Sequence, residues 1–394
     1  MAGVFSFPAI LPELASEWDL TNTRAGWING IYFAGYTLAV PFLASLTDRV
    51  DARRIYVAFA AVASLASVGF ATIAQGFWTA LAFRALGGLG LAGTFVPGLK
   101  ALVDRLAETA QARAVSFYTA TFGLGTSLSF FATGQISATL GWRWAFAFAA
   151  GAAALGLVLA AAALGPRPLG SEEAPTARLL DIRPVLRNRE AMRYVLAYSA
   201  HTWELFSFRS WVVAFLTFTL GLQPERGGYW APTTVAAAAG LVAMWANVGG
   251  AELALRFGQR RTITLVMFGS ALCAATAGLA AQAPHTAAVV FCVLYACLAQ
   301  GDSAALHIGT LQSASADRRG TTMAVQSLLG FVTASVGPLA VGVVLDSFGG
   351  GKSVLSWAAA FAAMGVASAL GPVFLPRGRS GVVSAPRLNE RNAL

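Results

Sequence analysis

The sequence predicts an all-α polytopic membrane protein with twelve transmembrane helices in two pseudo-symmetric six-helix bundles. Three observations predict this class. Two come from composition: 57% of the 394 residues are hydrophobic and only 11% are charged, whereas a soluble domain carries about 25% charged residues. The third is that apolar runs of about 20 residues recur, each long enough to cross a bilayer core of about 30 Å. The net charge of +9 does not indicate nucleic-acid binding, because the basic residues lie mostly in short loops between these runs.

The apolar runs divide into two sets of six. We predict them at residues 1–15, 26–46, 55–75, 77–99, 114–138, 144–164, 194–220, 229–254, 262–283, 286–311, 321–345 and 353–375. The longest break between runs contains Pro, Ser, Glu and Arg. The predicted organisation is therefore an N-terminal bundle (1–164), a cytoplasmic linker (165–193), a C-terminal bundle (194–375) and a cytoplasmic tail (376–394).

The first run is shorter than the others. From Met1 to Leu14 a helix spans only about 21 Å at 1.5 Å per residue. The run has no basic region before it and no cleavage site of a signal peptide. We expect the numbered start to lie inside the first helix, with further residues upstream.

Basic residues predict the orientation, since cytoplasmic loops carry the excess of Lys and Arg. Most of the 27 basic residues lie in the second, fourth, sixth, eighth and tenth breaks and in the tail. We therefore expect a multi-pass protein of the inner (plasma) membrane with both termini in the cytoplasm.

Two charged turns occupy equivalent places in the two halves. The first reads Ala-Ser-Leu-Thr-Asp-Arg-Val-Asp-Ala-Arg-Arg over residues 44–54, and the second reads Ala-Glu-Leu-Ala-Leu-Arg-Phe-Gly-Gln-Arg-Arg over 251–261. A turn that recurs in each half indicates an internal repeat, and membrane repeats of this kind build transporters.

The first turn resembles the loop 2–3 motif of the major facilitator superfamily, usually Gly-x-Leu-Ala-Asp-Arg-x-Gly-Arg-Arg. Leu46, Asp48, Arg49 and Arg53 match it in register. The second turn matches at Leu253, Ala254, Arg256, Gly258 and Arg260, but has Leu255 in place of the aspartate. The resemblance covers nearly the whole chain, and its general pattern is loosely similar to the cyanate-permease-type bacterial facilitators.

The resemblance implies a gating role for these turns. In the family the aspartate, here Asp48, bridges to neighbouring cytoplasmic helix ends, where a helix dipole favours an anion. Asp48, Arg49, Arg53 and Arg256 are the predicted gating residues. The alternative is that these charges only set the topology.

Charges inside the apolar runs mark the functional interior, because a charge in hydrocarbon costs at least about 2.5 kcal/mol. They fall in segments one, four, seven and ten, which in the resembled family line the substrate cavity. The predicted substrate or proton pathway contains Arg84, His201, Glu204, Arg209, Asp302 and His307.

Segment seven holds three of these residues. At about 100° per residue, His201 and Glu204 are about 60° apart and share a face, whereas Arg209 lies about 140° from Glu204. Arg209 therefore needs a partner elsewhere or a ligand, and Asp302 is the intramolecular candidate. A buried ion pair that holds the C-terminal half together and a role in substrate or proton handling are both open.

Glu204 is the first candidate for a proton carrier and Asp302 the second, since burial favours the neutral form of a carboxyl group. Each could instead be a permanently paired structural acid. His201 and His307 could titrate as well, or serve only as hydrogen-bonding residues. They lie on different helices with no third ligand in view, so we expect no metal site and no cofactor.

Arg84 begins Arg-Ala-Leu-Gly-Gly-Leu-Gly, which resembles the family's fourth-helix motif of an arginine followed by closely spaced glycines. The family associates that arginine with proton or substrate coupling. Its alternative role is a fixed hydrogen-bond donor, and the glycines allow neighbouring backbones to approach closely.

The leading hypothesis is a secondary active transporter, not an enzyme, that moves a small solute by alternating access with the proton as coupling ion. No Walker motif is present, which argues against direct ATP use. Arg84 and Arg209 favour a small organic or inorganic anion as substrate. The alternative is a proton-coupled efflux carrier for lipophilic or cationic compounds, with Glu204 and Asp302 as cation ligands. A third hypothesis is a non-transporting sensor or assembly protein.

Overall fold

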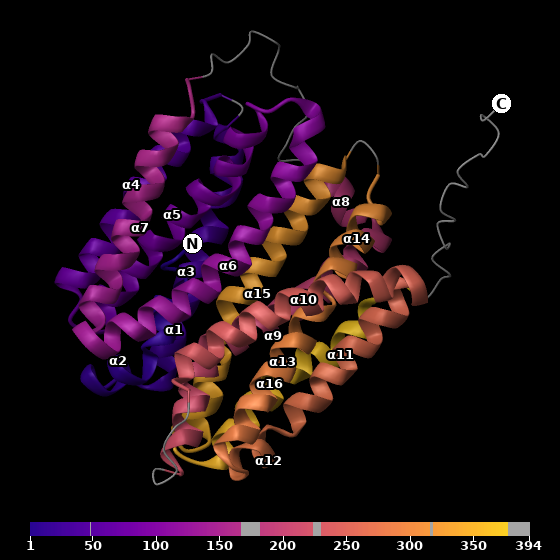
Figure 1. Ribbon diagram of the computed structural model, residues 1–394. Helices are drawn as coiled ribbons and strands as arrows, with labels where there is room; N and C mark the ends of the chain where they lie inside the picture. Colours follow the sequence, from indigo (N-terminus) through magenta and orange to yellow (C-terminus); the bar gives the residue numbers. More distant parts are fainter. Residues whose placement is uncertain (48, 167–181, 224–229, 316–317, 377–394) are drawn as a thin grey trace, which may run out of the picture.

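The computed structural model describes residues 1–47, 49–166, 182–223, 230–315 and 318–376, and every regular element among them is a helix (Figure 1). A first group contains α1 (Ser6–Ala9), α2 (Leu11–Glu17), α3 (Asn22–Leu46), α4 (Ala52–Ile73), α5 (Phe77–Val103), α6 (Glu108–Leu140) and α7 (Trp142–Ala163). A second group contains α8 (Arg183–Arg187), α9 (Arg189–Gly221), α10 (Pro232–Phe257), α11 (Gln259–Ala275), α12 (Ala277–Gln282), α13 (His285–Gly301), α14 (Ser303–Ser313), α15 (Arg319–Ser347) and α16 (Val354–Phe374).

The predicted all-helical class is confirmed, and each predicted apolar segment coincides with one long helix or with two consecutive helices. Seven helical stretches of the described residues are long and apolar enough to cross a membrane. They are Ala52–Ile73, Phe77–Val103, Trp142–Ala163, Pro232–Phe257, His285–Ser313, Arg319–Ser347 and Val354–Phe374. The count of twelve spans stays a prediction.

Three predicted segments are interrupted. The first is divided between α1 and α2 at Ile10, because Pro12 near the start of α2 has no N–H to continue the helical ladder. The ninth is divided between α11 and α12 at Thr276, and the tenth has one irregular residue, Asp302, between α13 and α14, which otherwise continue as the single stretch His285–Ser313. The last of these breaks falls on a predicted site residue.

The helices pack mainly within their own groups. In the first group α5 packs against α3 and α4, and α4 packs against α7; in the second, α9 is surrounded by α13, α14, α15 and α16. The two groups meet along α3 with α15 and along α6 with α10 (Figure 1). Much of the predicted linker lies outside the described residues, so the predicted domain boundaries remain predictions.

Glycines bring α3 and α5 into backbone contact. A Cβ on Gly88 would overlap the carbonyl oxygen of Tyr32, and one on Gly35 would lie 2.6 Å from the carbonyl oxygen of Ala85. This close approach explains the glycines that follow Arg84 in the sequence, and it fixes the position of Arg84 on α5.

The bundle has two ends with different loops. We call the end that carries the α3–α4, α5–α6 and α10–α11 connections the basic end, because both arginine-rich turns lie there. α3 and α10 begin, and α6 and α15 finish, at what we call the opposite end.

Candidate functional site

The long helix α9 carries three of the predicted site residues into the centre of the molecule. Asn188 begins it by accepting the amide of Ala191 with its side chain, a standard N-terminal cap. The helix then contacts α1 and α2 of the first group as well as α10 and α13–α16 of the second. Its side chains can therefore take part in contacts between the groups or inside the second group.

Arg209 lies where the two groups meet. Its guanidinium carbon is 5.8 Å from the ring centre of Phe5, in the first group, and 5.9 Å from that of Phe206. Its Nη2 donates a 2.9 Å hydrogen bond to Oε1 of Gln300. The expected pair with Asp302 is not formed; the structure gives Arg209 a neutral amide and two aromatic faces. This arrangement leaves its charge without a carboxylate among the described residues.

A small cavity of about 20 Å³ lies beside Arg209. Its wall includes Ser127 and Phe130 from α6, Phe208 from α9 and Gly240 from α10. The Ser127 hydroxyl is buried and has no hydrogen-bond partner among the described residues. Helices of both groups thus enclose a space that holds a cation and an unpaired hydroxyl.

Arg84 lies inside the first group. Its Nη2 donates to the carbonyl oxygen of Val4 at 3.1 Å, and its guanidinium carbon is 4.1 Å from the ring centre of Tyr32. Its Nε is buried without a hydrogen-bond partner among the described residues. A cavity of about 80 Å³ beside it is lined by α3, α4, α5, α7 and the first residues of the chain. Arg84 and Arg209 thus contact adjacent residues near the start of the chain, Val4 and Phe5.

Glu204 is buried inside the second group, where three hydroxyl groups donate to its carboxylate. Ser270 on α11 donates at 2.9 Å and Tyr295 on α13 at 2.7 Å, both to Oε1; Ser368 on α16 donates to Oε2. Buried polar groups need such partners, since an unpaired one costs about 1–3 kcal/mol. Glu204 consequently joins four helices of one group rather than facing the other group.

Asp302 lies in the break between α13 and α14 and pairs with α9. Its Oδ1 is 2.7 Å from Nδ1 of His201, and both side chains are buried. The two form an ion pair when the imidazole carries a proton. The sequence placed His201 and Glu204 on one face of α9, but in the structure they contact different neighbours.

His307 belongs to the same cluster. Its ring contacts Tyr198 edge-on at a centroid distance of 4.7 Å, and Tyr198 stacks on His201 at 5.6 Å. His307 Nδ1 lies 2.9 Å from the carbonyl oxygen of Ser303, one turn earlier in α14. Tyr198, His201, Asp302 and His307 therefore form one cluster of polar side chains, in which His201 and Asp302 are buried and the other two are half-buried.

Helix α10 supports the break at Asp302. The side-chain oxygen of Asn247 accepts the amide of Ala304 at 2.9 Å, which caps the start of α14. A Cβ on Gly250 would overlap the carbonyl oxygen of Gly301, so α10 can approach the break only with glycine there. With Asn247 as the cap, the carboxylate of Asp302 makes no cap bond of its own and is available to His201.

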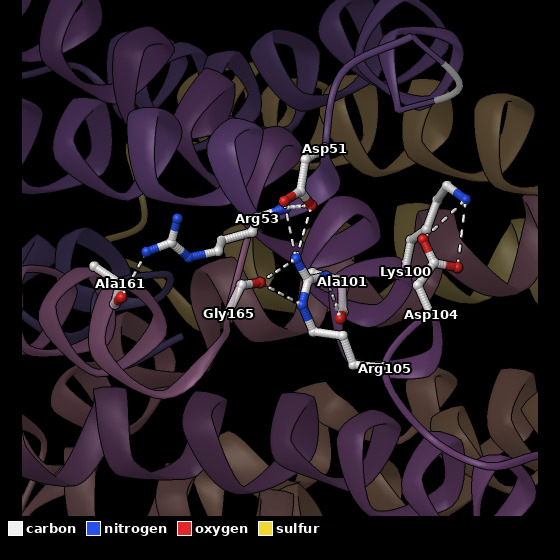
Figure 2. Close-up of polar contacts among 8 residues, drawn as sticks. All are labelled: Asp51, Arg53, Lys100, Ala101, Asp104, Arg105, Ala161 and Gly165. Carbon is white, nitrogen blue, oxygen red and sulfur yellow. Dashed lines mark hydrogen bonds and ion pairs between the residues drawn. The ribbon is translucent and has the colours of Figure 1, made fainter. Parts of the chain in front are cut away.

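The basic end holds a second polar network (Figure 2). Arg105, after α5, donates through Nη2 to both carboxylate oxygens of Asp51 at 2.9 Å, and through Nε and Nη2 to the carbonyl oxygen of Gly165. Asp51 also caps α4 by accepting the amide of Arg53 at 3.0 Å. The network joins the start of α4, the end of α5 and the segment after α7.

The predicted gating residues have different surroundings. Arg53 donates to the carbonyl oxygen of Ala161 on α7 at 2.6 Å (Figure 2). Arg256 pairs with Glu252 one turn earlier on the exposed face of α10, and Arg49 is exposed. Asp48 lies outside the described residues. The contact that the family resemblance predicts for Asp48 therefore stays a prediction.

Several partners were not expected from the sequence. Gln300, Asn247 and Tyr295 are uncharged and do not stand out in an apolar run. Asp51 occupies a motif position where the family usually has glycine. A signal for it was present, because an aspartate directly before Ala-Arg-Arg is a typical helix cap.

Comparisons with known proteins agree with this architecture. A family model described as "Major Facilitator Superfamily" matches residues 1–317. Niacin transporter NiaP of Acinetobacter baylyi is 28% identical over 140 residues, which are 36% of this chain and 31% of that protein. Protein spinster homolog 1 of Bos taurus is 26% identical over 304 residues, 73% of this chain and 57% of that protein.

A gentisate transporter of Corynebacterium glutamicum is 29% identical over 100 residues, 25% of this chain and 22% of that protein. The chain thus matches between about a fifth and somewhat more than half of the length of these relatives.

Solved structures share the fold. A bacterial homolog to the human lysosomal transporter Spinster, in an inward-facing and occupied conformation, has a TM-score of 0.73 at 16% identity, over 94% of this chain and 90% of that one. The nucleoside transporter NupG has a TM-score of 0.73 at 12% identity, over 94% of this chain and 93% of that one.

Proposed function

The chain belongs to the Major Facilitator Superfamily, and from this membership we propose that it is a secondary active transporter that moves a small organic anion by alternating access. The two groups of helices would rock about the contacts that α3 makes with α15 and α6 with α10. We propose that they correspond to two six-helix bundles in the plasma membrane, with the basic end and both termini in the cytoplasm.

The observation that carries the choice of substrate is the position of Arg209. It is a cation between the groups, it is bounded by the rings of Phe5 and Phe206, and among the described residues its hydrogen-bond partner is the neutral Gln300. A guanidinium fork suits a carboxylate, and aromatic rings beside it suit a flat apolar body. An aromatic monocarboxylate meets both requirements.

The relatives' names support this class. One is a niacin transporter and another a gentisate transporter, and both compounds are aromatic monocarboxylates. Their matches cover only part of each chain. The proposed substrate class therefore rests mainly on the surroundings of Arg209.

We assign proton coupling to the pair of His201 and Asp302. Asp302 lies at the junction of α13 and α14, where one residue interrupts the regular hydrogen bonding of the stretch His285–Ser313. The carboxylate and the imidazole are 2.7 Å apart, and a proton on the imidazole makes them an ion pair. Release of that proton would alter how α14 is held against α9.

The surroundings of the acids disfavour efflux of cations. Glu204 accepts three hydroxyl hydrogen bonds inside the second group, and Asp302 lies against His201. Both would have to leave their partners before they could bind a cationic substrate, whereas Arg209 already lies between the groups.

A thermal-shift experiment on the purified protein tests the substrate class. Benzoate, benzamide and benzylamine present the same ring with a negative, neutral or positive group. A ligand at 100 times its Kd stabilises the native state by about 2.7 kcal/mol. We expect benzoate alone to raise the melting temperature, and Arg209→Ala to remove this shift.

Arg143→Ala is the matched control. Arg143 also lies over an aromatic ring, 4.3 Å from the centre of Trp142, but it is exposed at the start of α7. This variant should keep the benzoate shift. Stabilisation by benzylamine without any by benzoate would contradict the proposal and favour the efflux alternative.

A further inference from the structure

Asp346, near the end of α15, joins the two groups of helices at the opposite end. Its Oδ1 accepts the backbone amide of Asn22 at 3.0 Å and that residue's side-chain Nδ2 at 2.8 Å. Its Oδ2 accepts the backbone amide of Thr23 at 2.8 Å and its hydroxyl at 2.6 Å. Four donors from two adjacent residues thus bind one carboxylate from the other half of the chain.

These donors lie at the start of α3, where helical amides have no intrahelical acceptor. A negative charge is favoured there by the helix dipole, and hydrogen bonds to a charged acceptor are about twice as strong as neutral ones. The hydroxyl of Thr21 accepts the backbone amide of Arg24, which follows the two amides bound by Asp346, at 3.2 Å. The start of α3 therefore obtains much of its cap from α15.

The same two helices are in backbone contact below this cap. A Cβ on Gly26 would lie 2.7 Å from the carbonyl oxygen of Pro338, and one on Gly30 would overlap that of Ser335. On α15, a Cβ on Gly342 would overlap the carbonyl oxygen of Asn22. Packing this close is sensitive to separation, because a gap of about 0.5–1 Å already loses about a quarter to a half of the dispersion energy.

The α6–α10 contact closes the other flank of this end. A Cβ on Gly134 would overlap the side chain of Thr233, and Gln135 Nε2 donates to Thr234 Oγ1 at 3.4 Å. This 3.4 Å hydrogen bond from the Gln135 side chain is weak compared with the four hydrogen bonds to Asp346.

We propose that Asp346 is a gating residue that keeps the opposite end closed by capping α3. This inference rests on the proposed function, since alternating access requires the two groups to separate at this end during each cycle. Separation exposes four donors and one carboxylate together. The strength of this contact therefore sets how often the opposite end opens.

Hydrogen–deuterium exchange of the full-length protein in nanodiscs tests the proposal without any substrate. Asp346→Asn keeps the size of the side chain but removes its charge and one acceptor atom. Loss of one charge-assisted bond corresponds to about a tenfold change in an equilibrium. We expect exchange in peptides covering residues 22–30 and 335–345 to become about tenfold faster or more.

Glu17→Gln is the matched control. Glu17 lies at the same end and accepts the indole N–H of Trp142 at 2.8 Å, but this bond stays within the first group. Glu17→Gln removes the same charge as Asp346→Asn, and exchange in the peptides covering 22–30 and 335–345 should not change. Thr23→Val, which deletes one side-chain donor, should give a smaller acceleration than Asp346→Asn.

Unchanged exchange at 22–30 in Asp346→Asn would overturn the gating role, and so would equal acceleration in every peptide, which indicates a loss of overall stability. Neither result bears on benzoate binding through Arg209. Conversely, local acceleration with no benzoate stabilisation would support the gating contact and contradict the proposed substrate.

Discussion

At the scale of single residues, Asp302 and Glu204 differ in what holds their carboxyl groups. Glu204 accepts three hydroxyl hydrogen bonds from three helices of one group. Asp302 contacts a titratable partner, His201, in a helix break. The charge of the Asp302–His201 pair therefore bears on a contact between two helices, whereas Glu204 is bound by three hydroxyl groups.

This difference predicts separate effects of two equivalent substitutions. Asp302→Asn should abolish benzoate accumulation driven by a pH gradient in proteoliposomes, while exchange of labelled for unlabelled benzoate continues. Glu204→Gln should keep gradient-driven accumulation and instead lower thermal stability, because glutamine removes the charged acceptor and leaves one acceptor oxygen where the carboxylate has two. Loss of accumulation in Glu204→Gln with retention in Asp302→Asn would contradict this assignment.

The sequence predicted which residues are chemically unusual but not their partners. Arg84, His201, Glu204 and Asp302 were selected as charges in apolar runs, and all four are buried. The helical wheel separated Arg209 from Glu204, and in the structure Arg209 bonds to Gln300 while Asp302 lies against His201. Partners on other helices depend on how helices rotate in the bundle, which one helix's periodicity does not contain.

At the scale of elements, the interruption of segment ten is the feature with most consequence. The sequence predicted one transmembrane segment over 286–311. The structure has α13 and α14 with Asp302 between them, a break supported from α10 by Asn247 and by the space at Gly250. A break held by another element leaves little trace in its own sequence.

Removal of this support has a measurable effect. Asn247→Ala deletes the side-chain cap of Ala304, and loss of an N-cap costs about 1 kcal/mol. We expect faster hydrogen exchange of the first amides of α14, in peptides covering 302–308. Gln282→Ala is the control, because Gln282 is exposed and its side chain donates to Gly278 within α12. Equal exchange at 302–308 in Asn247→Ala and the unaltered protein would show that α14 does not need this cap.

At the scale of the whole molecule, hydropathy predicted the fold class, and the charged turns predicted the family. The residues that join elements at the basic end were only partly visible. Asp51 and Arg105 lie 54 positions apart and meet at the ends of α4 and α5, with Gly165 from the segment after α7 (Figure 2). Hydropathy gives the order of helices, but not which loop ends meet.

Arg105 should matter more to stability than its neighbour Lys100. Arg105 holds a half-buried carboxylate and two carbonyl groups, whereas Lys100 forms an exposed pair with Asp104 one turn away. We expect Arg105→Gln to lower the free energy of unfolding by about 1–3 kcal/mol, and Lys100→Gln by no more than about 0.5 kcal/mol. Denaturant titration in micelles measures both, and equal effects would contradict the network's role.

The cap on α3 also has an evolutionary consequence. Two of its four donors are backbone amides, which no substitution except proline can delete. Mutation can therefore change all four bonds at once only through position 346, and codons for aspartate and asparagine differ by a single base. One nucleotide would be enough to change how long the protein stays closed at this end, without altering any residue that contacts the cargo.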